Sequence, residues 1–261
     1  MQDSWLREFI ADWQLSGRAP RTAIEYVRYI NNLNSYYQIP SLADVKEWLH
    51  ASPGASVRRK KAQAVRAFGR WCEDAGVEEF VWWRKVPLVV DEIRPQATVT
   101  EEIYLQVLAR CRTHLDRALV ELLWSTGLRR SEIKRLRIED VDLVNGFVVV
   151  VTSKSGKPRV IPISPKAQKA LRRVIGTRMQ GSVLGLSGNA IRLRLNRLGA
   201  PSAHAWRRGW AVQSLKLGVS EASVKSSAGW SSGTMVSRYV QTLESDLALA
   251  EFRRSWNSPI S

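Results

Sequence analysis

One segment of the chain has the pattern of a β-hairpin, and the segments around it have the pattern of helices. Phe147–Val151 and residues 159–163 are rich in β-branched side chains, and the turn between them contains lysine and glycine, which predicts two antiparallel strands. Elsewhere apolar residues recur mostly at helical spacing. The sequence therefore predicts a mainly α-helical protein with one small β-hairpin or sheet.

The N-terminal part of the chain is predicted to be an all-helical domain. Pro20 suits a helix start, and Ser41 suits an N-cap position. Residues 84–98 lack a helical period and contain Pro87 and Pro95, as expected of a connecting segment. The predicted helices of this domain cover residues 4–15, 20–36, 42–50 and 55–74.

The second part of the chain combines helices with the hairpin, which makes it a mixed α+β domain. Thr98-Val-Thr-Glu101 has the pattern of a capping box and predicts a helix start. We divide the chain into a helical domain at 1–90, a linker at 91–98 and a second domain at 99–261 that ends in a tail helix. The other helices predicted in this domain cover residues 115–125, 165–175, 188–198, 203–216, 220–228 and 231–243.

The chain is strongly basic, and its positive charge is unevenly distributed. Its 40 Lys and Arg against 24 Asp and Glu give a net charge of +16. Residues 1–95 carry 14 basic and 12 acidic side chains, whereas residues 96–261 carry 26 and 12. Charge that only aids solubility need not segregate in this way. The distribution favours a nucleic-acid partner whose phosphate backbone binds mainly to the second domain.

Two predicted helices carry clustered basic residues that are candidates for DNA contact. Each cluster has a second interpretation, as a solvated basic face or as arginines whose apolar stems lie along the surface. The local concentration of charge favours contact with the phosphate backbone. The candidates are Arg58, Arg59, Lys60, Lys61 and Arg66 in one helix, and Arg192, Arg194 and Arg197 in the other.

Other classes of protein find little support in the sequence. Cys72 and Cys111 are too few for a disulfide framework. No apolar run is long enough to span a membrane, and the N-terminus lacks the features of a signal peptide. Three histidines and no clustered carboxylates offer no metal site. We expect a cytoplasmic protein that makes no contact with a membrane.

Several side chains in the second domain have the chemistry needed to cleave a phosphodiester. Arg129 and Arg207 can bind both non-bridging oxygens, because each guanidinium presents a planar fork of donors. His204 lies three residues before Arg207, so the two share a helix face. A tyrosine hydroxyl such as that of Tyr239 can attack phosphorus, and a lysine such as Lys154 can protonate the departing oxygen.

These residues lie in motifs that resemble the tyrosine recombinase, or phage integrase, family. Thr126-Gly-Leu-Arg-Arg-Ser-Glu132, the lysine-bearing hairpin, His204-x-x-Arg207, and Ala228-Gly-Trp230 with Tyr239 nine residues on occur in the family's order and spacing. The resemblance covers nearly the whole chain. It implies that the first domain is a core-binding, SAM-like DNA domain and the second the catalytic domain, as in simple two-domain members without an arm-binding domain.

The resemblance also implies a role for each catalytic residue. Arg129 and Arg207 would clamp the scissile phosphate, and Tyr239 would be the nucleophile. His204 would relay the tyrosine proton. Trp230 stands where many members have histidine, and it would only position a group, because an indole N–H donates a hydrogen bond but does not exchange protons.

The remaining site residues are less sharply assigned. Lys154 would be the general acid, since the family's lysine takes the first position of this turn, but Lys157 is close enough to compete. Glu132 matches the family's acidic residue and would orient the site rather than react. Arg208 stands where the family often has histidine, a departure that removes no catalytic group.

The resemblance implies a site-specific recombinase that cleaves DNA through a 3′-phosphotyrosyl bond and exchanges strands through a Holliday junction, without metal or nucleotide cofactor. It implies a monomer in free solution and a homotetramer on synapsed core sites, in a bacterial host, with a directionality factor as a further partner. A tail at 244–261 docks on a neighbouring protomer or packs on its own domain. The alternatives are a type IB topoisomerase and a catalytically silent DNA-binding relative.

Overall fold

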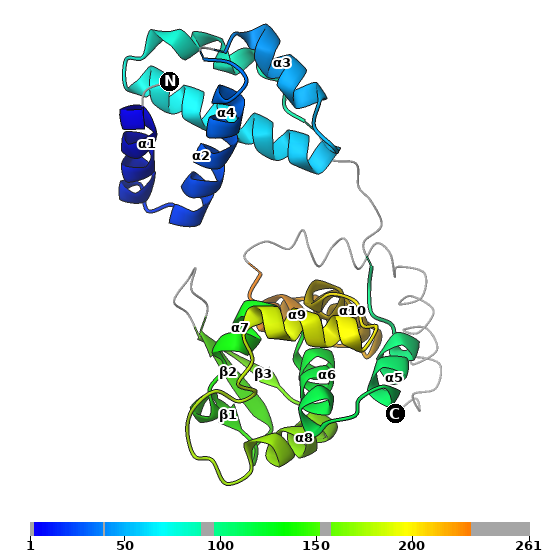
Figure 1. The fold of residues 1–261 in the computed structure, drawn as a ribbon. Coiled ribbons are helices and arrows are strands. Elements are labelled where there is room, and N and C mark those ends of the chain that lie inside the picture. Colours follow the sequence, from blue (N-terminus) through cyan, green and yellow to red (C-terminus); the bar gives the residue numbers. More distant parts are fainter. Residues whose placement is uncertain (1–2, 39, 90–96, 152–157, 231–261) are drawn as a thin grey trace, which may run out of the picture. The chain divides into compact units, whose positions relative to one another are not determined.

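A computed structural model describes residues 3–38, 40–89, 97–151 and 158–230. The chain divides into two compact units, Met1–Pro95 and Gln96–Ser261, and Figure 1 shows the helices and strands of each. The first unit is helical, and the second adds a small antiparallel sheet to its helices. The predicted fold class, mainly α with a small sheet, is therefore confirmed.

The first unit packs its helices around an aromatic core. Phe9 and Phe68 meet edge to face, with ring centroids 5.5 Å apart, and Ile30 and Val45 are buried beside them. Gly69 lies so close to Trp83 that a Cβ there would come within 2.3 Å of the Trp83 side chain. The helices are α1 (Asp3–Leu15), α2 (Pro20–Asn34), α3 (Leu42–His50), α4 (Ala55–Asp74) and the 3₁₀ helix η1 (Glu78–Lys85).

The second unit is built around α6, whose Leu119, Leu122 and Leu123 are fully buried. Helices α8 and α10 pack against it, and the sheet order is β1-β2-β3 with Val149 opposite Val160. The elements are α5 (Glu101–Ala109), α6 (His114–Thr126), α7 (Arg130–Arg135), η2 (Ile138–Asp140), β1 (Val141–Asp142), β2 (Phe147–Val151), β3 (Pro158–Pro162), α8 (Pro165–Ile175), α9 (Gly188–Arg197), α10 (Ala203–Lys216) and α11 (Glu221–Ala228).

The start of α5 differs from the predicted capping box. The N-cap is Thr100, whose hydroxyl accepts a hydrogen bond from the Ile103 N–H, and not Thr98. Val99 is buried, and its N–H donates to the Ala205 carbonyl, so this segment is held against α10 before the helix begins. The helices η1 and α7 and the strand β1 were not predicted, and the predicted helix at 231–243 lies outside the described residues.

In the part of the chain that the structure describes, no helix is both long enough and apolar enough to cross a bilayer.

Candidate active site

The first catalytic motif forms a tight elbow between α6 and α7. Gly127 ends α6 with φ of 57°, and its N–H donates to the Leu123 carbonyl. A Cβ at Gly127 would lie 2.6 Å from the Trp210 ring, so only glycine fits both the conformation and the space. The elbow delivers Arg129 to the N-terminus of α7, where its side chain remains 32% exposed.

Glu132 lies beneath Arg129 as a buried carboxylate. Its side-chain oxygens accept from the Arg129 N–H and from Arg129 Nη1, both at 2.8 Å. A third hydrogen bond comes from Arg159 Nη2 at 2.9 Å. Burial alone would raise the pKa of Glu132, but the hydrogen bonds from Arg159 and Arg129 outweigh it and lower that pKa. Glu132 is thus ionised, and it fixes the orientation of Arg129.

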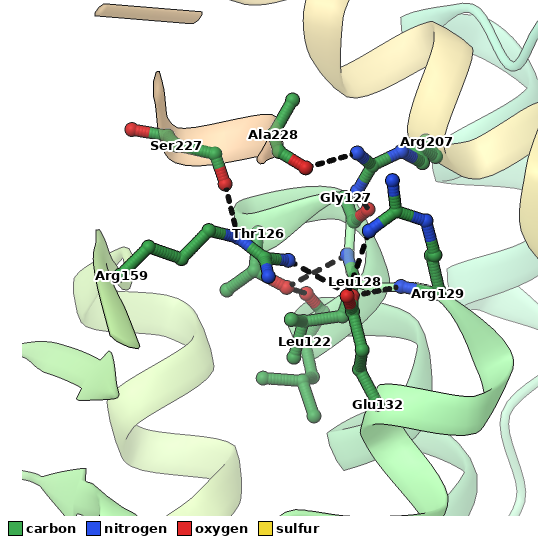
Figure 2. Close-up of polar contacts among 10 residues, drawn as sticks. All are labelled: Leu122, Thr126, Gly127, Leu128, Arg129, Glu132, Arg159, Arg207, Ser227 and Ala228. Atoms are coloured by element: carbon green, nitrogen blue, oxygen red, sulfur yellow. Dashed lines mark hydrogen bonds and ion pairs between the residues drawn. The ribbon is translucent and has the colours of Figure 1, made fainter. Parts of the chain in front are cut away.

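Arg207 is the most deeply buried basic residue of the site, with 3% of its surface exposed. Its Nη1 donates to the Gly127 carbonyl at 2.9 Å, and its Nη2 donates to the Ala228 carbonyl. Figure 2 shows the Arg207 and Arg129 side chains side by side above Glu132. The elbow and the end of α11 therefore both hold Arg207 beside Arg129.

His204 lies one turn before Arg207, in the first turn of α10. Its side chain is exposed. Partial desolvation lowers the pKa of His204, and the positive charges of Arg208, Arg207, Arg129 and Arg130 lower it further. The imidazole is therefore kept neutral, the form that accepts a proton.

Trp230 follows directly from the C-terminus of α11. Gly229 adopts φ of 63°, and the Trp230 N–H returns to the Lys225 carbonyl at 3.1 Å, as in a Schellman cap. The Arg207 guanidinium lies over the Trp230 ring, 5.1 Å from its centroid. Cation–π contact thus couples the indole to one of the two candidate phosphate ligands.

Arg159 is a further candidate site residue, which the sequence motifs did not reveal. It lies on β3 with 9% of its surface exposed, on the same face of the strand as Ile161. Besides Glu132, it binds the Ser227 carbonyl through Nε at 2.7 Å. The sequence did contain a signal for this residue. Side chains two positions apart on a strand share a face, so an apolar, buried Ile161 predicts a buried Arg159, and a buried arginine is expected to have an acidic partner.

Two predicted catalytic residues and one predicted supporting residue have no place in this geometry. Lys154, Lys157 and Tyr239 lie outside the described residues. Within the described ranges, 3–38, 40–89, 97–151 and 158–230, no group of three or more His, Cys, Asp and Glu is arranged to hold a metal ion.

The candidate DNA-binding residues of α4 make contacts within the first unit. Arg58 and Lys61 donate to the Leu49 and Trp48 carbonyls, at the end of α3. Lys60 pairs with Glu25 at 3.0 Å. Arg66 donates to the Val86 carbonyl at 2.7 Å and to the Arg84 carbonyl, and Arg59 is exposed. Part of the basic run therefore holds neighbouring segments in place, and its contact with DNA stays a prediction.

The arginines of α9 are divided in a similar way. Arg194 Nη1 and Arg197 Nη2 both bind the buried carboxylate of Asp116, at 2.6 and 2.7 Å. Arg192 is exposed and binds the Asn189 side chain within its own helix. Arg194 thus serves the packing of α9 on α6, whereas Arg192 and the largely exposed Arg197 remain candidates for phosphate contact.

Known proteins resemble this chain in sequence and in fold. The model of the phage integrase family matches residues 97–245. The tyrosine recombinase XerA of Saccharolobus solfataricus is 29% identical over 176 residues, 64% of this chain and 60% of that protein, so the chain spans about six-tenths of that relative's length. A lambda integrase dimer bound to a COC′ core site has a TM-score of 0.74 at 19% identity, over 90% of this chain and 76% of that one. A lambda integrase tetramer bound to a Holliday junction has a TM-score of 0.73 at 18% identity, over 90% and 76%.

Proposed function

Because the chain belongs to the phage integrase family, we propose that it is a site-specific DNA recombinase. It cleaves one strand of duplex DNA at a core site, keeps the strand on the protein through a 3′-phosphotyrosyl bond, and rejoins it to a new partner. The bond energy is conserved in the covalent intermediate, so rejoining requires no nucleotide cofactor.

The pairing of Arg129 with Arg207 is the observation that carries this proposal. The Arg207 guanidinium binds the carbonyl of Gly127, two residues before Arg129, and Glu132 holds Arg129 by two hydrogen bonds. Both guanidinium groups are fixed before substrate arrives. Preorganised donors of this kind stabilise the negative charge that develops on phosphorus oxygens in a transition state.

The proposed cleavage step transfers two protons and exchanges one bond at phosphorus. The Tyr239 hydroxyl attacks the phosphorus and forms a new P–O bond, while the bond from phosphorus to the 5′ oxygen breaks. His204 accepts the proton of the tyrosine, in keeping with its lowered pKa. Lys154 gives a proton to the 5′ oxygen, which leaves as a hydroxyl, and Trp230 positions Arg207 without exchanging a proton.

The proposed partners are duplex core sites and further copies of this chain. A lambda integrase, with the same fold, forms a tetramer on a Holliday junction, and we extend that assembly to this chain, in a bacterial cytoplasm and with a directionality factor. The first unit is proposed as the core-binding DNA domain. The candidates for phosphate contact are the exposed Arg59 and Lys60 of α4 in the first unit, and the exposed Arg192 and Arg197 of α9 in the second unit.

A suicide substrate tests the proposal. A nicked core site traps the covalent intermediate because the short cleaved strand diffuses away, and the adduct is resolved on a denaturing gel in EDTA. We expect an adduct with wild-type protein and with the exposed-tyrosine control Tyr36→Phe, and none with Tyr239→Phe. An adduct at normal yield with Tyr239→Phe would refute the assigned nucleophile, and relaxation of site-free supercoiled DNA by a monomer would favour a type IB topoisomerase instead.

A further inference from the structure

Arg159 links two parts of the candidate active site from the core side. Its Nη2 binds Glu132 Oε2 at 2.9 Å, and its Nε binds the Ser227 carbonyl at 2.7 Å. Figure 2 shows its guanidinium between the acidic side chain on α7 and the end of α11. These contacts join three elements that are distant in sequence: α7, β3 and α11.

The guanidinium of Arg159 is closely enclosed. A Cβ at Gly229 would lie 3.3 Å from Arg159 Cδ and 3.4 Å from its Nε and Nη1. Arg159 Nη1 is buried and has no hydrogen-bond partner among the described residues. A buried ion pair adds little net stability when compared with apolar packing of the same volume, and an unpaired buried N–H is costly. Stability alone therefore does not account for an arginine at this position.

Both partners of Arg159 lead to a candidate phosphate ligand, Glu132 directly and Ser227 through the next residue. Glu132 is the carboxylate that binds both the backbone and the guanidinium of Arg129. Ser227 immediately precedes Ala228, whose carbonyl accepts from Arg207 Nη2. Arg159 is thus connected to Arg129 through Glu132, and to Arg207 through the adjacent residues Ser227 and Ala228.

We propose that Arg159 is a positioning residue for DNA cleavage, and this inference rests on the proposed function. It keeps Glu132 in the orientation that aims Arg129, and it holds the last turn of α11 where Ala228 and Trp230 meet Arg207. Because both guanidinium groups depend on the same buried side chain, they keep their mutual spacing. Arg159 itself does not touch the phosphate.

Single-turnover cleavage of the suicide substrate at saturating DNA tests this role. Arg159→Met removes both contacts, and we expect DNA affinity within about twofold of wild type. We expect the cleavage rate to fall by about 10–100-fold, the range found when groups that orient metal-binding side chains are lost. Arg159→Lys keeps the buried positive charge but lacks the planar fork that reaches both partners. It is expected to fold and to cleave more slowly than wild type.

Arg178→Met is the matched control for lost carbonyl contacts. Arg178 donates to four backbone carbonyls at and after the end of α8, including those of Val174 and Ser182. These hydrogen bonds involve none of the site residues that the structure describes. Its loss is expected to lower the midpoint of chemical unfolding without changing the cleavage rate of the folded protein. A double-mutant cycle of Arg159→Met with Glu132→Gln is expected to be strongly non-additive, since the two side chains act as one unit.

The outcomes separate this inference from the proposed function. Wild-type protein that forms no adduct contradicts the function and the inference with it. If wild-type protein cleaves the substrate, and Arg159→Met and Arg159→Lys both cleave it at the wild-type rate, only the inference about Arg159 is contradicted. The inference is also contradicted if the cleavage rates of the two Arg159 variants fall only in proportion to the fraction of folded protein, as expected for Arg178→Met. Additive effects of Arg159→Met and Glu132→Gln on the cleavage rate would contradict it as well.

Discussion

Arg207 Nη1 donates a hydrogen bond of 2.9 Å to the carbonyl of Gly127, across 80 residues of sequence. The same glycine turns the chain so that Arg129 follows at the start of α7. Gly127 therefore helps to position both candidate phosphate ligands, Arg207 through its carbonyl and Arg129 through the turn that it makes. The left-handed conformation of Gly127 and its contact with Trp210 are structural conditions for that pairing.

Gly127→Ala is expected to destabilise the protein more than an equivalent change elsewhere. The new Cβ meets both a φ of 57° and the Trp210 ring at 2.6 Å. Gly76→Ala is the matched control, because Gly76 also follows the end of a helix, with the hydrogen bonds of a Schellman cap and φ of 73°, but nothing lies within 4 Å of its Cβ. The control should cost about 1–2 kcal/mol, and Gly127→Ala about 1–3 kcal/mol more for overpacking. Urea unfolding measures both, and equal losses would argue against the packing effect.

The arginines of α9 are expected to fall into two groups. Arg192→Ala should leave the free energy of unfolding unchanged. It should reduce the steepness of the plot of log DNA-binding constant against log salt concentration by about 1, as expected for one lost phosphate contact. Arg194→Ala should cost about 1.5–3 kcal/mol of stability, because it removes a hydrogen bond to buried Asp116. Fluorescence-anisotropy titrations over a range of salt, together with unfolding curves, measure both. A salt slope that falls for Arg194→Ala and not for Arg192→Ala would reverse the assignment.

The cleavage rate should depend on the ionisation of His204. The pKa of His204 is lowered by desolvation and by nearby arginines, so the imidazole stays neutral as the pH falls toward its ordinary pKa. The decline of the cleavage rate on the acid side of the pH–rate profile, its acid limb, should therefore lie below about pH 6.5. Arg130→Gln removes one of those positive charges, so the pKa rises and the limb moves to higher pH. Lys134→Gln, on the same helix, is the control. Single-turnover rates between pH 5 and 8 on a substrate at saturation measure the shift, and a limb that moves to lower pH would contradict it.

Much of the helical fold was predictable, because in long amphipathic helices the apolar residues recur at a helical spacing that can be read from the sequence. Helices α3, α4, α8 and α10 occupy the predicted ranges. The six residues of α7 and the two of β1 are too short for a period to be read from the sequence. The cap of α5 was misplaced because burial of Val99 against α10, a tertiary contact, decides where that helix begins.

Candidate site residues that lie within sequence motifs were predictable, whereas a residue placed by tertiary packing was not. Arg129, His204 and Arg207 were identified from their motifs, and the structure brings them together. Arg159 belongs to no motif that we singled out, and its role becomes visible only when Glu132 and Ser227 are seen to converge on it. The contacts of a residue that links elements distant in sequence cannot be predicted from the residues next to it in the chain.

Arg129 and Arg207 are proposed to neutralise the scissile phosphate together, and cleavage of a substrate with a neutral methylphosphonate at that position tests this charge neutralisation. On an ordinary phosphate, Arg129→Ala and Arg207→Ala should each lower the single-turnover cleavage rate by about 10²–10³-fold. On the methylphosphonate, which lacks one charged oxygen, at least one of the two variants should recover most of that loss relative to wild type. Equal losses on both substrates, for both variants, would contradict the phosphate clamp.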